Sequence, residues 1–93
     1  MFGLRYKTLR LIPSKTAAEE MLKYGLMISD CKHILKEGYD APRKRAKDTE
    51  EKWLDKGNKT YNVVVVKSFN FMYNKDVWLI THVGRFTRSN LGG

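Results

Sequence analysis

Cations and aromatic rings around one histidine are the side chains of this sequence that could do chemistry. His82 lies in an apolar run whose alternate residues point to the same side if the run is a strand. The preceding apolar run places Tyr61 and Lys67 on one face of its own strand. If pairing brings these faces together, one surface collects the candidate catalytic residues, which are Lys67, His82, Arg85 and Arg88. The sequence does not fix the strand register that decides this.

These residue types fit metal-independent cleavage of RNA. A base removes the proton of the ribose 2′-hydroxyl, cations stabilise the charge on the phosphorus oxygens, and an acid protonates the leaving 5′-oxygen. The same residue types also bind RNA without cutting it, with cations on phosphates and aromatic rings on bases. A partly buried histidine with a structural role remains the alternative for His82.

Further cations lie before and at the start of the valine-rich run. We expect the following residues to bind nucleic acid: Arg43, Lys44, Arg45, Lys47, Lys56, Lys59 and Tyr61. The 18 Lys and Arg outnumber the 10 Asp and Glu, giving a net charge of +8. Such a balance predicts an acidic partner, either nucleic acid or an acidic protein. A solvated basic surface without a partner is the alternative, above all for the cluster at 43–47.

Several other kinds of site are not expected. Cys31 is the only cysteine, and the two histidines have no further metal-binding side chains at ligand spacing, so we expect neither a disulfide nor a metal site. No phosphate-cradling or dinucleotide motif is present, and we expect no cofactor. A trio of Ser68, His82 and Asp76 lacks the strand–turn–helix context of a catalytic serine.

No apolar run approaches the ~18 residues of a membrane-spanning helix. The basic residues near the N-terminus are not followed by the long apolar stretch of a signal peptide. The sequence therefore predicts a cytoplasmic protein that does not bind membranes.

Helix signals lie between residues 14 and 38. Thr16 and Glu19 have the spacing of a capping box, and Gly25 is expected just after the end of this helix. Ser29 can cap a second helix that Gly38 ends. Two helices of about eight residues are too short to be stable alone, so we expect a helical hairpin packed on a sheet.

Runs of β-branched and aromatic residues predict the sheet. A first strand over residues 2–12 ends at Pro13. A three-stranded meander follows, with a turn at Gly57–Asn58 and strands over 49–55, 60–68 and 77–88. We predict one α+β domain over residues 1–93, with two short N-terminal helices packed on a small antiparallel-dominated sheet and a frayed tail at 89–93.

The segments Glu51–Val66 and Val77–Arg88, preceded by a helical hairpin and a basic loop, resemble the RelE/ParE-like toxin superfamily. The likeness covers residues 14–88 and is greatest to a prokaryotic branch of small proteins described only as a domain of unknown function. Active members of the superfamily are ribosome-dependent or free endoribonucleases, or gyrase poisons, and their RNA-cutting residues lie on the sheet face and near the C-terminus.

The resemblance implies a RelE-like fold, RNA that is free or ribosome-bound as substrate, and an acidic antitoxin-like protein as partner. It also implies catalytic roles for Lys67, His82, Arg85 and Arg88. The sequence departs from the superfamily at two places. No tyrosine or histidine follows Arg88, and the segment 14–17 reads Ser-Lys-Thr-Ala where the related branch often has Ser-x-His-Ala. Both departures bear on catalysis rather than on the fold.

Overall fold

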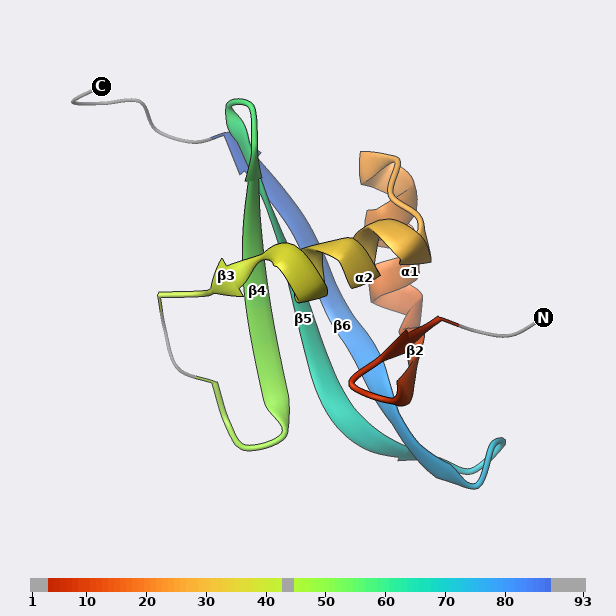
Figure 1. Cartoon of the computed structure of the whole chain (residues 1–93). Helices are drawn as coiled ribbons and strands as arrows, with labels where there is room; N and C mark the ends of the chain where they lie inside the picture. Colours follow the sequence, from red (N-terminus) through yellow and green to blue (C-terminus); the bar gives the residue numbers. More distant parts are fainter. Residues whose placement is uncertain (1–3, 43–44, 88–93) are drawn as a thin grey trace.

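One curled sheet and two helices make up the computed structural model, which describes residues 4–42 and 45–87 (Figure 1). The elements are β1 (Arg5–Tyr6), β2 (Leu9–Pro13), α1 (Lys15–Tyr24), α2 (Ile28–Glu37), β3 (Tyr39–Asp40), β4 (Thr49–Lys56), β5 (Lys59–Asn70) and β6 (Lys75–Thr87). The six described strands run in the order β1-β2-β6-β5-β4-β3. Neighbours are antiparallel except β2 and β6, which are parallel.

The long hairpin of β5 and β6 is the centre of the sheet. Val63 and Val65 of β5 are fully buried and belong to the main core, together with Trp78 and Ile80 of β6. We call the face that carries these four residues the inner face, and the opposite face the outer face. β-Branched residues suit this position because they pack well on a pleated, buried surface.

A β-bulge at Thr81 changes which side chains of β6 share a face. Val65 is opposite Ile80, but the next residue, Val64, is opposite His82, so Thr81 has no partner of its own on β5. After the bulge, the residues of β6 therefore point to the opposite face from the one that simple alternation would give them. Ile80 and Val83 both reach the core, and His82 lies on the outer face with Val64. The alternation expected from sequence, which puts His82 on the same face as Trp78 and Ile80, is wrong for this reason.

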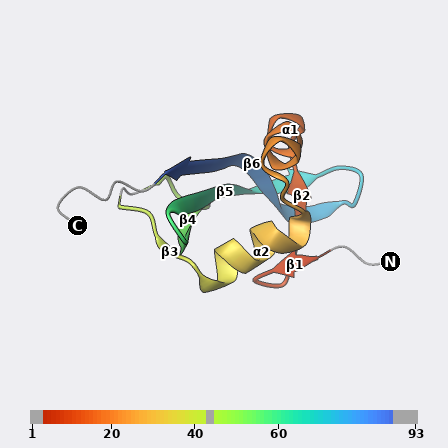
Figure 2. The ribbon, with the colours of Figure 1, turned by 90° about the horizontal axis from the view of Figure 1, so that it is seen from above.

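The two helices lie at different places around the sheet, α1 beside β6 and α2 against β4 and β5 (Figure 2). α2 covers the inner face with Cys31, Ile34 and Leu35. α1 runs beside β6 beyond the end of β2 and contributes Ala17 and Met21 to the same core. Cys31 is fully buried, and this burial, with the nearby charge of Asp30 as a smaller cause, raises the pKa of its thiol to about 12.

The predicted fold class, with two N-terminal helices packed on a small antiparallel-dominated sheet, is wrong. Two strands precede the helices, one strand pair is parallel, and strands hold about twice as many described residues as helices. The expected strand at 2–12 is a hairpin in the described part, β1 and β2, whose turn is Lys7–Thr8. Both turn residues have positive φ values, 47° and 69°, without the glycine or asparagine that usually marks such a turn.

The helix boundaries are partly as expected. Gly25 and Gly38 follow the two helices. Ser14, not Thr16, caps α1, because its hydroxyl accepts the N–H of Ala17. The predicted cap of α2 at Ser29 is also wrong, since Met27 holds that position and donates its N–H to Asp30.

The later hairpins follow the prediction more closely. β4 covers the strand expected at 49–55 and turns at Gly57–Asn58 into β5, with Gly57 at φ 63°. A left-handed φ of this kind is adopted by glycine without steric cost. Residues 71–74 join β5 to β6, and both strands extend toward this connection beyond the predicted ends at 68 and 77. Among the described residues, no helix is long and apolar enough to cross a membrane.

Candidate nucleic-acid interface

Three aromatic rings cross the outer face at the end of the sheet near the β4–β5 turn. Tyr39 is opposite Trp53, and their ring centroids are 6.4 Å apart. Trp53 meets Phe86 of β6 at 5.2 Å, with the rings edge to face. We call Tyr39, Trp53 and Phe86 the aromatic row. Tyr39 and Phe86 are 47% and 41% exposed.

Buried polar groups beneath the aromatic row hold it in place. Glu51 is 5% exposed, and one of its carboxylate oxygens accepts the indole N–H of Trp53 at 2.8 Å and the amide of Asn62 at 3.2 Å. The other oxygen accepts the guanidinium of Arg45 at 2.8–2.9 Å. A buried carboxylate is stable only with partners of this kind, so this network fixes the position of Trp53.

His82 lies on the same face as Trp53, because Trp53 is opposite Asn62, Asn62 is opposite Gly84, and His82 is two residues from Gly84. Its Nδ1 is 3.0 Å from Oε2 of Glu20 in α1, and its side chain is 48% exposed. The other carboxylate oxygen of Glu20 accepts the N–H of Val83 at 2.8 Å. An Nδ1 proton directed at Glu20 would leave the lone pair of a neutral His82 on Nε2, which could then accept a proton.

Gly84 leaves room between His82 and Asn62. A Cβ at Gly84 would overlap Oδ1 of Asn62 and come within 3.1 Å of Nε2 of His82. The small residue thus allows the imidazole and the amide to approach the same place on the outer face. Sequence reasoning gave this glycine no role.

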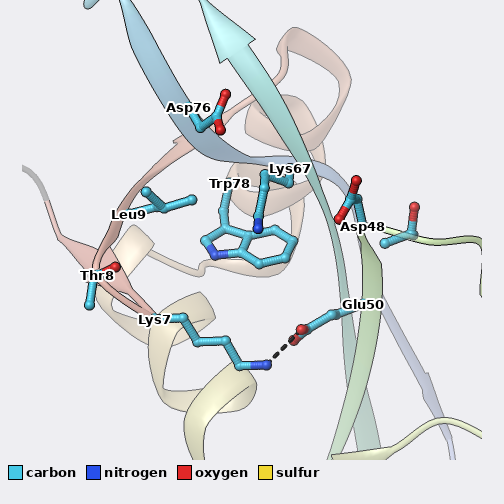
Figure 3. Close-up of a pocket in the computed structure, with 9 residues that line it drawn as sticks. Lys7, Thr8, Leu9, Asp48, Glu50, Lys67, Asp76 and Trp78 are labelled. Carbon is cyan, nitrogen blue, oxygen red and sulfur yellow. Dashed lines mark hydrogen bonds and ion pairs between the residues drawn. The ribbon is translucent and has the colours of Figure 1, made fainter.

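Lys67 is not brought to His82. It is opposite Trp78 on the inner face, where its Nζ lies 5.6 Å from the centre of the indole ring. It lines a hollow of about 430 Å³ at the other end of the sheet (Figure 3). The surface expected to collect Lys67, Tyr61 and His82 is therefore divided between two faces, because of the bulge at Thr81.

The inner face near the β4–β5 turn holds several of the other predicted residues. Tyr61 is opposite Arg85, whose guanidinium lies 5.2 Å from the ring of Tyr24. Tyr61 and Lys56 line a small hollow of about 80 Å³ together with His33. Lys59 is opposite Thr87 and donates to its hydroxyl. These cations are separated from His82 by the thickness of the sheet.

The basic loop before β4 is only partly described. Arg45 pairs with Glu51 as above, and Lys47 is exposed. Arg43, Lys44 and Arg88 lie outside the described residues. Within the described ranges, no group of three or more His, Cys, Asp or Glu side chains is arranged to hold a metal ion.

Sequence reasoning missed Glu20, Tyr39 and Phe86. Tyr39 follows Gly38, which was expected to end the second helix, and it lay in none of the predicted strands, whereas it begins the short strand β3. Glu20 carries no local signal, since its partners are 62 and 63 residues away in the chain. The row could be found only with the register of β3, β4 and β6 known. Compared with family models, curated proteins and solved structures, the chain matches none.

Proposed function

We propose that the outer face binds single-stranded RNA and that the chain is a toxin-like, metal-independent RNA endonuclease or a degenerate relative of one. The observation that carries the proposal is the position of the aromatic row on the same face as the exposed His82–Glu20 pair. Exposed rings on a sheet are a common platform for unpaired bases, which stack with little dependence on sequence. The net charge of +8 favours a polyanion as partner.

In the proposed reaction, Nε2 of His82 accepts the proton of a ribose 2′-hydroxyl. The 2′-oxygen then attacks the adjacent phosphorus, the bond to the 5′-oxygen breaks, and a 2′,3′-cyclic phosphate remains. The leaving 5′-oxygen takes a proton from the imidazolium or from water. Glu20 is a positioning residue, because it fixes the tautomer and orientation of His82 without touching RNA.

A non-catalytic RNA-binding module is the second candidate. It is favoured by the separation of Lys67 and Arg85 from His82, since cations close to the phosphate supply much of the stabilisation in such reactions. In this case the aromatic row still binds RNA, and His82 has a structural role through Glu20.

The test is incubation of the purified protein with labelled single-stranded RNA in EDTA, with and without ribosomes. An endonuclease yields cyclic-phosphate ends, and His82→Ala abolishes cutting while RNA affinity stays within about twofold. Trp53→Ala and Phe86→Ala should each weaken binding about fivefold or more, because stacking is worth ~1–3 kcal/mol per base. Phe71→Ala, at an exposed ring on the β5–β6 connection, is the matched control that should bind normally.

The two candidates differ in the outcome. Salt-sensitive binding that needs the aromatic row, without cutting in either condition, supports the module. Binding unaffected by Trp53→Ala and Phe86→Ala would contradict the outer face as the RNA site. No binding at all would contradict both candidates and leave an acidic, antitoxin-like protein as the partner to seek.

A further inference from the structure

The hollow at the far end of the inner face has the properties of a ligand pocket. It is lined by the β1–β2 turn on one side and by β4, β5 and β6 on the other (Figure 3). Its volume of about 430 Å³ is within the range of small-molecule sites. The aromatic row and His82 do not contribute to it.

Trp78 provides a hydrogen-bond donor that is not used by the protein. The residue is 4% exposed, and among the described residues its indole N–H has no hydrogen-bond partner. Figure 3 shows the indole in the middle of the lining residues, with its nitrogen on the side of Leu9 and Thr8. A buried donor without an acceptor reduces the stability of the folded protein by about 1–3 kcal/mol. An acceptor atom supplied by a ligand would therefore be bound favourably.

The charged groups of the pocket are arranged on different walls. Lys67 lies over the indole of Trp78, so this wall brings together an ammonium group and the buried, unpaired N–H of the indole. The facing strand β4 and the residue before it bring the carboxylates of Glu50 and Asp48, which accept from donor groups (Figure 3). Glu50 is already bonded to Tyr6 and Lys7, but a carboxylate can accept further hydrogen bonds.

The balance of charge argues against a phosphate group as the ligand. Two lysines and three acidic residues line the pocket: Lys7, Lys67, Asp48, Glu50 and Asp76. A planar, neutral group with acceptors on one edge and donors on another fits this balance better. Guanine has this pattern, with O6 and N7 as neighbouring acceptors and N1–H and the 2-amino group as neighbouring donors. Lysine commonly binds O6 and N7 of guanine, and carboxylates accept from amino and imino groups of bases.

We propose that this pocket binds a guanine base, with O6 and N7 toward Lys67 and the N–H of Trp78, and with the donor edge toward Asp48 and Glu50. The inference deepens the proposed function, and rests on it for the source of the base, which is an unpaired guanosine of RNA. The RNA would then contact both faces, with one base extruded into the pocket.

The β1–β2 turn is placed to cover the bound base. Lys7 and Thr8 both have left-handed φ values, and Thr8 is β-branched, so this backbone conformation is unfavourable. The turn is connected to β4 through the bond from Lys7 to Glu50, with 2.6 Å between Nζ and Oε2. A small outward movement of this turn would admit an acceptor atom to the N–H of Trp78.

Nuclear magnetic resonance of the indole groups tests the proposal directly. The chain has two tryptophans, and the Trp53→Phe variant identifies the signal of Trp78. The ¹⁵N-labelled protein is titrated with the four nucleoside 5′-monophosphates, which share one phosphate and differ in the base. Guanosine monophosphate should move the Trp78 indole signal downfield in a saturable way and bind about tenfold or more tightly than the others.

Two lysine variants provide the controls. Lys67→Met should abolish the shift, and Lys75→Met, at an exposed residue of β6 that does not line the pocket, should leave it unchanged. The rest of each spectrum shows whether the variant is folded. No shift, an equal shift with all four nucleotides, or a shift that survives Lys67→Met would overturn the proposal. If only the RNA assay fails, binding of guanosine monophosphate in the pocket is still supported. If only the titration fails, RNA binding by the aromatic row is still supported.

Discussion

Glu20 of α1 holds His82 of β6 through a carboxylate oxygen 3.0 Å from Nδ1. The same carboxylate accepts the N–H of Val83, which would otherwise be an unpaired donor at the point where β2 has ended and β6 becomes an edge of the sheet. One side chain thus attaches the helix to the sheet and orients the imidazole. This double role allows its effects on stability and on chemistry to be separated by substitution.

Replacement of Glu20 by alanine should reduce the free energy of unfolding by about 1–3 kcal/mol, because the N–H of Val83 and the imidazole both lose their acceptor. Glu20→Gln should cost less, since the amide oxygen can still accept from Val83. Urea unfolding at pH 7 measures both. Glu19→Ala, at the exposed neighbouring position, has the same gain in helix propensity and is the matched control. Equal stabilities of Glu19→Ala and Glu20→Ala would refute the attachment.

Gly84 is the position where added volume should damage the outer face most directly. In Gly84→Ala the new methyl group meets Oδ1 of Asn62, whose amide is held by Glu51, so we expect a loss of about 1–3 kcal/mol. Combining Gly84→Ala with Asn62→Ala removes the overlap. The double variant should therefore be less destabilised than the sum of the two single variants. Strict additivity in thermal or urea unfolding would show that the methyl group is accommodated elsewhere.

The sequence predicted the local elements of this fold better than their arrangement. β-Branched residues indicate β5, and Gly57 and Gly25 mark a hairpin turn and a helix end, because these signals depend on neighbouring residues only. The turn at Lys7–Thr8 carries no such signal, so β1 and β2 were taken as one strand. The parallel pairing of β2 with β6 joins two strands that are far apart in the sequence. No short segment of the sequence encodes such a pairing.

The candidate site was predictable only in part for a similar reason. His82 was singled out from its residue type, and in the structure its side chain is 48% exposed. Its neighbours depend on the bulge at Thr81, because one extra residue in a strand exchanges the two faces beyond it. Lys67 and His82 therefore lie on different faces. Glu20 lies next to His82, and Phe86 lies on the same face as His82.

The bonds of Glu50 predict how stability changes in acid. Partial burial alone would raise the pKa of Glu50, but hydrogen bonds from Lys7 and Tyr6 outweigh it, and the pKa lies below its ordinary value of 4.5. A carboxyl with a lowered pKa binds fewer protons in the folded state, so its contribution is present above the ordinary pKa and is lost as pH falls through the lower folded value.

The matching experiment compares wild type with Glu50→Gln across pH. The variant should be less stable by about 1 kcal/mol at pH 7, a modest cost because Lys7 is largely exposed, and the difference should shrink as pH falls through the lowered pKa of Glu50. Urea unfolding at several pH values measures it. Glu37→Gln, at an exposed carboxyl at the end of α2, should show no such trend. A difference that stays constant with pH would mean that the charge of Glu50 is not responsible.

The connection between β5 and β6 exposes apolar side chains that the fold does not need. Phe71 and Met72 are 89% and 87% exposed, and the ring of Phe71 contacts only the half-exposed Phe69 among the described aromatic rings. Replacing both Phe71 and Met72 by serine should change the free energy of unfolding by less than about 0.5 kcal/mol, because little buried area is lost. The same change should lower retention on a hydrophobic-interaction column, since an exposed apolar patch is removed. Leu35→Ala, in the core, should instead cost about 2–5 kcal/mol. A large loss of stability in the serine variant would mean that these side chains pack against the protein in solution.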